Sequence, residues 1–191
     1  MPRTPPPLPA ARRVDAERNR ERILDAARDA FADPDADVSM AEISRRAGVG
    51  SATLYRNFPN RRALLEALYL DEIDAVCQAA STITGDTPEA ILVAWLRRFY
   101  AYFTSKRFVA AELLEHADRD DPVFGAGLER VLNASRPLLR AAQQSGEVRP
   151  DLTLEQILDL LAAIAKIPGD AGYREPILRA ALDALQPAKG G

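Results

Sequence analysis

Cysteine and histidine are nearly absent from this chain, which has one of each in 191 residues. A lone cysteine, Cys77, cannot form a disulfide within the chain, and Cys77 together with His116 does not supply the ligand set of a zinc site. No nucleophile motif surrounds either residue, and we interpret Cys77 as a small helix-packing residue rather than a redox sensor. We therefore expect no enzymatic activity, no bound metal and no cofactor, in a protein of the reducing cytoplasm.

Long apolar runs are also absent. The most apolar stretch, residues 160–165, is bounded by Asp159 and Lys166. It is far shorter than the roughly 20 residues that cross a bilayer. The first residues are rich in proline and have no apolar run of the kind that a signal peptide requires. We expect neither a membrane partner nor export.

The chain has no excess of positive charge, because 25 lysines and arginines face 28 acidic residues and the net charge is −3. No global positive field is therefore available to attract nucleic acid. The distribution is uneven, since twelve arginines and nine acidic residues up to Leu65 give this part +3 and leave −6 for the remainder. Arginine clusters of this kind suit phosphate contact. The alternative is that these arginines lie on solvated helix faces.

Strand patterns are missing as well. From Arg12 onward nearly every segment has apolar residues at three- and four-residue spacing, which predicts an all-α fold of about nine helices. The first helix is expected from about Asp15 to Phe31, and the second after a capping box of Ser39 and Glu42. Ser51 and Asn60 are expected to cap the third and fourth helices, and Thr87 is expected to cap the helix over 88–105. The later helices are expected over 108–116, from 122 to Gly146, through Ile167 after a capping box of Thr153 and Gln156, and over 177–185.

The second and third of these helices are joined by a connection of about three residues, the glycine-rich segment 48–50. Two short helices with such a turn are typical of a helix-turn-helix, in which the second helix enters the major groove of DNA. With Leu54 pointing inward, a rotation of about 100° per residue puts Phe58 on the same side. The outward side and its flanks then carry Ala52, Thr53, Tyr55 and Arg56, side chains that suit base edges and phosphates. An ordinary helical corner is the alternative.

Residues 38–65 read VSMAEISRRAGVGSATLYRNFPNRRALL, which closely resembles the DNA-binding signature of TetR-family transcriptional regulators. The resemblance covers about residues 15–70. The proline-rich first residues predict a disordered arm over 1–14. The resemblance implies a helix-turn-helix domain over 15–62 and a helical effector-binding and dimerisation domain over 63–186, and we expect a flexible tail over 187–191. The segment Gly146–Asp151 resembles one that recurs in the SbtR-like branch of this family.

Carried over by position, the resemblance implies that Ser39 meets DNA phosphate. The residues that would face the groove are Ser51, Ala52, Thr53, Tyr55 and Arg56. Asn57 stands where the family commonly has histidine and keeps a phosphate donor. Arg61 or Arg62 takes the basic position that opens the fourth helix.

An aromatic stripe in the C-terminal part has two interpretations, a core or the wall of an effector pocket. The candidate pocket residues are Trp95, Phe99, Tyr102, Phe103, His116 and Phe124. The family resemblance favours the pocket and implies a repressor that a small, mostly apolar effector releases from a palindromic operator. The alternative is a DNA-binding regulator whose C-terminal domain serves only dimerisation or protein contact.

The helix over residues 154–167 is apolar nearly all the way around, so one face can cover the chain's own core while another needs a partner. A self-complementary interface closes with two-fold symmetry, which predicts a homodimer. The interface candidates are Leu158, Leu161, Ile164, Leu182 and Leu185. The expected partners are therefore double-stranded operator DNA, a second copy of the chain and an unidentified small molecule.

Overall fold

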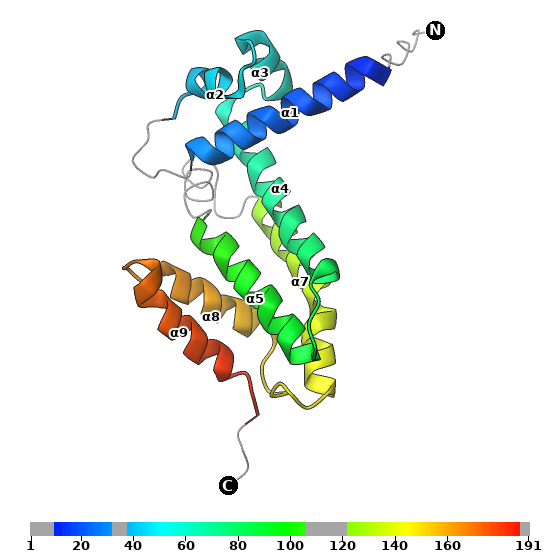
Figure 1. The fold of residues 1–191 in the computed structure, drawn as a ribbon, viewed down its shortest axis with the longest axis vertical. Coiled ribbons are helices and arrows are strands. Elements are labelled where there is room, and N and C mark those ends of the chain that lie inside the picture. The colour runs from blue at the N-terminus through cyan, green and yellow to red at the C-terminus, as the bar shows by residue number, and fades with distance from the viewer. Residues whose placement is uncertain (1–9, 32–37, 106–121, 188–191) are drawn as a thin grey trace. The chain divides into compact units, whose positions relative to one another are not determined.

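Every regular element in the described part of the chain is a helix, and eight helices are present (Figure 1). The computed structural model describes residues 10–31, 38–105 and 122–187. The all-α class predicted from periodicity is confirmed. Three predictions lie outside the described residues: the proline-rich arm up to residue 9, the helix over 108–116 together with His116, and the tail from residue 188.

The N-terminal unit contains α1 (Ala10–Ala30), α2 (Met40–Ala47), α3 (Ser51–Asn57) and the part of α4 (Arg61–Thr82) up to Leu68. α2 and α3 pack against α1 and against each other (Figure 1). The buried apolar side chains of this unit include Ile23, Ala27, Phe31, Ile43, Leu54, Phe58, Leu64 and Leu65. Since every helix contributes to one core, the outer side of α3 is held at a defined orientation.

Helix caps set the ends of these short helices. Ser39 Oγ accepts a hydrogen bond from Glu42 N at 3.1 Å, and Asn60 Oδ1 accepts one from Ala63 N at 2.8 Å, so both predicted N-caps are confirmed. The predicted cap at Ser51 is wrong. Gly50 already has the extended conformation that precedes α3, with φ −71°, which makes Ser51 the first helical residue.

The C-terminal unit contains the rest of α4, α5 (Pro88–Ser105), α7 (Pro122–Gln144), α8 (Leu154–Lys166) and α9 (Ala171–Asp183). α5 packs against α7 and α8, and α8 packs against α9. Trp95 lies fully buried in the core of this unit, and its Nε1 donates to the Val76 carbonyl at 3.1 Å. A buried tryptophan with its one donor satisfied contributes apolar burial without a polar cost.

Two helices begin earlier than expected. α1 begins at Ala10 rather than Asp15, because alanine and arginine, which have high helix propensity, occupy positions 10–13. α9 begins at Ala171 rather than Ile177, because Asp170 caps it by accepting from Tyr173 N at 2.8 Å and Pro176 is tolerated inside the helix. None of the described helices has the length and apolarity needed to cross a bilayer.

Candidate nucleic-acid interface

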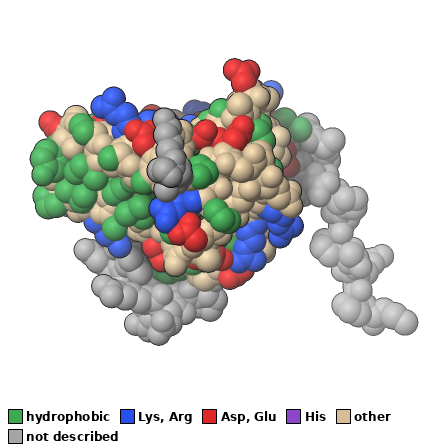
Figure 2. All heavy atoms as spheres, turned by 90° about the horizontal axis from the view of Figure 1, so that it is seen from below, with side chains coloured by type: hydrophobic (Ala, Val, Ile, Leu, Met, Phe, Trp, Pro, Cys, Tyr) green, Lys and Arg blue, Asp and Glu red, His purple; other side chains and the backbone are tan. Residues whose placement is uncertain are grey.

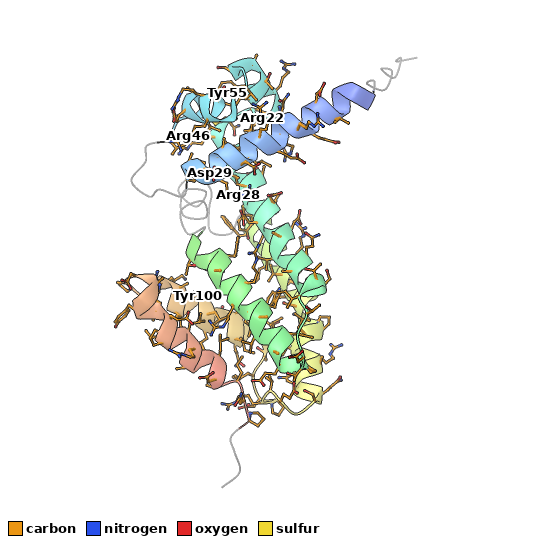
Figure 3. All side chains as sticks on the ribbon, viewed as in Figure 1. Arg22, Arg28, Asp29, Arg46, Tyr55 and Tyr100 are labelled. Carbon is orange, nitrogen blue, oxygen red and sulfur yellow. The ribbon has the colours of Figure 1, made fainter. Side chains whose placement is uncertain are left out.

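The third helix separates its buried and exposed sides as the rotation arithmetic predicts. Leu54 is fully buried and Phe58 is 1% exposed, whereas Tyr55 is 51% exposed. The Tyr55 side chain is labelled in Figure 3. Ala52 and Arg56 are also exposed, and Thr53 is half-buried. The inward and outward directions are therefore confirmed, and contact of the outward side chains with DNA stays a prediction.

The turn between α2 and α3 depends on a glycine in a left-handed conformation. Gly48 has φ +61° and ψ +36° and closes α2 by donating its N–H to the Arg45 and Ser44 carbonyls. Arg22 Nη2 of α1 donates to the Gly48 carbonyl at 3.2 Å. Ser44 Oγ donates to the Val49 carbonyl at 2.7 Å. Side chains on both sides of the turn thus fix the angle at which the chain enters α3.

Two arginines that the sequence grouped with candidate phosphate contacts have aromatic partners inside the unit. The Arg20 guanidinium lies 4.7 Å from the centroid of the Phe58 ring. The Arg61 guanidinium lies 5.1 Å from the Phe31 centroid, and its Nη1 also donates to the Val38 carbonyl. Cation–π contacts and hydrogen bonds of this kind hold helices together. Both rings belong to apolar residues at or near helix ends in the sequence, but sequence spacing does not identify which arginine contacts which ring.

A carboxylate on α2 holds two further arginines. Arg45 Nη2 and Arg46 Nε both donate to Glu42 Oε1 at 2.7 Å, and Arg45 Nε donates to Glu42 Oε2 at 2.9 Å. Hydrogen bonds from Arg45 and then Arg46 lower the pKa of the Glu42 carboxyl to about 2. The expected capping box at Ser39 is thus only half formed, because the Glu42 side chain binds arginines instead of the N-cap backbone.

The remaining predicted contacts make local hydrogen bonds. Asn57 Nδ2 donates to the Thr53 carbonyl at 2.8 Å, and Arg56 Nε donates to the Ala52 carbonyl at 3.1 Å. Arg62 Nε donates to Glu66 at 2.7 Å. Arg56 is exposed on the outer side of α3, whereas Asn57 and Arg62 are half-buried.

The aromatic stripe of α5 divides into a core part and a half-buried part. Trp95 and Phe99 stack at 5.7 Å between centroids and are at most 4% exposed, so they belong to the core. The half-buried part consists of Tyr102 and Phe103. Together with the half-buried rings of Tyr69 on α4 and Phe124 on α7, these two residues form what we call the Tyr102 cluster. Tyr69 meets Phe124 edge to face at 5.3 Å, and Tyr102 meets Phe103 at 6.0 Å. Burial is the main cause that raises the pKa of the Tyr102 hydroxyl.

The side chains predicted for a dimer interface are buried within the single chain. Each is at most 3% exposed in the single chain and belongs to its core: Leu158, Leu161, Ile164, Leu182 and Leu185. Four of these residues lie on the inner sides of α8 and α9, and Leu185 lies just beyond the end of α9. Their part in a dimer interface stays a prediction. The exposed large apolar side chains of the two helices are Leu160, at 45%, and Tyr173, at 61%.

The two short helices, the glycine turn and the exposed side of α3 define a helix-turn-helix DNA-binding regulator. The comparisons agree with this class. Residues 23–68 match the family described as bacterial regulatory proteins, tetR family. Residues 87–187 match the family described as transcriptional regulator SbtR-like, C-terminal domain.

Relatives align over nearly the whole chain. A TetR transcriptional regulator of known structure from Streptomyces coelicolor is 34% identical, with a TM-score of 0.72 over 88% of this chain and 98% of that one. The TetR regulatory protein of Mycobacterium vanbaalenii is 31% identical, with the same TM-score over 91% and 98%. The regulator UidR of Escherichia coli strain K12 is 26% identical over 182 residues, which are 90% of this chain and 93% of UidR.

This chain belongs to the TetR family of bacterial transcriptional regulators and has an SbtR-like C-terminal domain. Both the family and the branch agree with the resemblance found in the sequence. The matched families and relatives are transcriptional regulators and not enzymes.

Proposed function

We propose that the chain is a repressor that binds a palindromic operator as a homodimer and leaves it when a small, mostly apolar effector binds the C-terminal unit. The observation that carries the DNA part is the outer side of α3. Leu54 and Phe58 anchor that helix completely, while Tyr55 and Arg56 project from it. A recognition helix needs this combination, because its outward side chains reach base edges in a defined register only when the helix itself is held rigidly.

Each exposed side chain of α3 has a chemistry that suits the groove. Ala52 is small and permits close approach, and Thr53 offers a hydroxyl and a methyl group for base contact. Arg56 can pair with two acceptors of a guanine, and Ser39 presents the start of α2 to a phosphate. Arg61 contributes to this interface by holding the segment before α2 against α1.

Replacing Arg56 with alanine tests the DNA interface. The expected loss of operator affinity is about 1–3 kcal/mol, with relaxed preference at one base pair, if Arg56 reads a base. The operator is first selected from random duplexes with the wild-type protein, and affinities are measured by fluorescence anisotropy. Arg140→Ala on α7 is the control, because it removes an exposed arginine of the C-terminal unit. Unchanged binding by folded Arg56→Ala and Tyr55→Ala proteins would overturn the interface.

The Tyr102 cluster supports the effector part of the proposal. Its partly exposed rings pack against the buried core. An apolar ligand can therefore bind by packing against these rings. The full burial of Trp95 favours the rival function, in which the domain serves only assembly. A thermal-shift screen of aromatic and aliphatic compounds supplies a probe. Since coupling between sites is reciprocal, operator DNA should weaken binding of that probe. Equal affinities with and without operator favour the rival.

Apolar residues on the outer sides of α8 and α9, some exposed and some half-buried, support the homodimer. On α8, Leu160, Ala163 and Ile167 follow one another at helical spacing, the last just beyond the helix end. On α9, the corresponding stripe is Tyr173, Ile177, Ala180 and Ala184. Hydrophobic side chains gather at the left of Figure 2, over the α8 and α9 side of the C-terminal unit. A two-fold partner that covers these stripes would remove them from water.

A further inference from the structure

The exposed side of α2 carries a group of three charged residues, which we call the Glu42 cluster: Glu42, Arg45 and Arg46. The Glu42 carboxylate lies between the two guanidinium groups, and its Oε1 accepts from both arginines at 2.7 Å. The side chains of Arg45 and Arg46 are 75% and 41% exposed, and that of Glu42 is 26% exposed. Both cations are thus open to solvent while they are bound to one carboxylate.

In this arrangement one carboxylate holds two arginines, which differs from the contacts of Arg20 and Arg22 in the same unit. Arg20 and Arg22 have an aromatic ring and a backbone carbonyl as partners, which hold the helices together. The partner of Arg45 and Arg46 is an anion on the surface. A DNA phosphate offers a guanidinium the same pair of acceptor oxygens, so it competes directly with Glu42.

We propose that Glu42 limits the sequence-independent DNA affinity of the helix-turn-helix by holding Arg45 and Arg46 away from the phosphates. The inference rests on the proposed function, because it needs α2 to cross the DNA backbone as the first helix of a helix-turn-helix does. The three side chains together carry +1, whereas the two arginines alone carry +2. Loss of the Glu42 carboxylate therefore frees one guanidinium group to bind a phosphate, and it removes the repulsion between the carboxylate and the DNA phosphates.

The geometry assigns different parts to the two arginines. Arg45 donates from Nε and Nη2 to the two oxygens of Glu42. It must break this bidentate pair of hydrogen bonds before it can bind a phosphate in the same way. Arg46 reaches Glu42 through Nε. The carboxyl stays ionised at any pH used for DNA binding, since the arginines lower its pKa to about 2. Release of Arg45 is thus the larger change when Glu42 is neutralised.

Glu42→Gln in the full chain tests the inference with a neutral side chain of the same shape. Its affinity for a random-sequence duplex of about 20 base pairs is measured by fluorescence anisotropy between about 50 and 200 mM salt. The slope of log affinity against log salt is expected to steepen by about 0.9, so that the gain over wild type is about threefold larger at the lower salt. Arg45→Gln in the Glu42→Gln background should return the slope to the wild-type value.

A second charge-matched variant separates this effect from charge alone. Asp25→Asn on α1 also removes one carboxylate paired with one arginine, Arg28, in the same unit, and it should leave the slope unchanged. Three results would each overturn this inference while leaving the proposed DNA interface intact. They are an unchanged slope in Glu42→Gln, an equal gain in Asp25→Asn, and weaker binding by a folded Glu42→Gln protein. A wild-type protein that fails to bind any duplex would overturn the proposed interface as well.

Discussion

Gly48 is the residue on which the geometry of the α2–α3 turn depends. Its φ of +61° is unfavourable for any residue with a side chain, and an added Cβ would lie 2.7 Å from Arg22 Nη2. We predict that Gly48→Ala lowers the free energy of unfolding by about 1–2 kcal/mol, since alanine pays that cost in the left-handed region. Urea unfolding followed by circular dichroism measures the change, and duplex affinity should fall with it because α3 is reoriented.

Gly50 provides the matched control two residues away. Its φ is −71°, and an added Cβ meets nothing within 4 Å. Gly50→Ala exchanges a small loss of capping for a less flexible unfolded chain, so its stability should stay within about 0.5 kcal/mol of wild type. Equal destabilisation by the two substitutions would show that the turn does not require the left-handed conformation at Gly48.

The Glu42 cluster gives the fold a defined acid dependence. The folded pKa of Glu42, about 2, lies below its ordinary value of 4.5. A depressed carboxyl pKa stabilises the fold above 4.5, and that contribution disappears as the pH falls toward 2. We predict that the melting temperature of wild type exceeds that of Glu42→Gln at about pH 6 and that the gap closes across this acid range. A gap that does not change with pH would contradict the ion pairs.

At the scale of single residues, the side of a helix on which a side chain lies was predictable from sequence, but the contact partners of that side chain were not. The turn angle of a helix fixes that Leu54 points inward and Arg56 outward, so these assignments needed only the sequence. Arginine side chains are long and flexible, and their partners come from other helices or from the next turn. The contacts of Arg20 with Phe58 and of Arg22 with Gly48 therefore required coordinates.

Among whole helices, short-range caps explain which ends were predictable. Thr153 and Gln156 form the complete capping box expected for α8, with hydrogen bonds of 2.9 and 3.3 Å. Thr87 Oγ1 likewise accepts from Ala90 N at 3.2 Å at the start of α5. The beginning of α9 was missed because Pro176 suggests a break, although Asp170 supplies a cap just ahead of it. Capping outweighs one missing backbone donor at that position.

α7 contains two glycines with opposite surroundings, and they yield a paired prediction. An added Cβ at Gly127 would lie 2.5 Å from Tyr69 Oη, whereas at Gly125 it meets nothing within 4 Å. Gly125→Ala should stabilise the protein by about 0.5–1 kcal/mol through helix propensity. The free energy of unfolding of Gly127→Ala should be about 1 kcal/mol lower than that of Gly125→Ala, because Tyr69 must leave its edge-to-face contact with Phe124.

Thermal unfolding measures both variants, and near-ultraviolet circular dichroism reports on the Tyr69 ring. Only Gly127→Ala should change that spectrum, since Tyr69 packs on this glycine. Equal stabilisation by the two substitutions, with no spectral change, would show that Tyr69 does not cover α7 at this point.

For the whole molecule, the apolar periodicity of α8 predicted that a partner is needed, but the residues it selected are buried in the single chain. Leu158 and Leu161 recur at the same spacing as the exposed residues, and composition does not show which stripe of an all-round apolar helix faces its own core. Only packing against α5 and α9 decides this. Leu160 and Tyr173 are the exposed interface candidates on the outer sides of these helices. Substitutions at these two positions should leave the core intact.

Leu160→Glu tests the dimer without disturbing the core, because this side chain is 45% exposed. Full burial of one leucine side chain contributes about 1.5–3 kcal/mol. Leu160 has 45% of its surface left to bury and occurs twice in a two-fold dimer, so the total is of similar size and the variant should raise the dimer dissociation constant about tenfold to a hundredfold. Operator affinity should fall in parallel, since two recognition helices must reach successive major grooves together. Leu128→Glu on α7, at 51% exposure, is the matched control and should stay dimeric. Sedimentation velocity distinguishes the outcomes: a monomeric wild type at micromolar concentration, or a Leu160→Glu protein with unchanged association, would place the interface elsewhere or remove it.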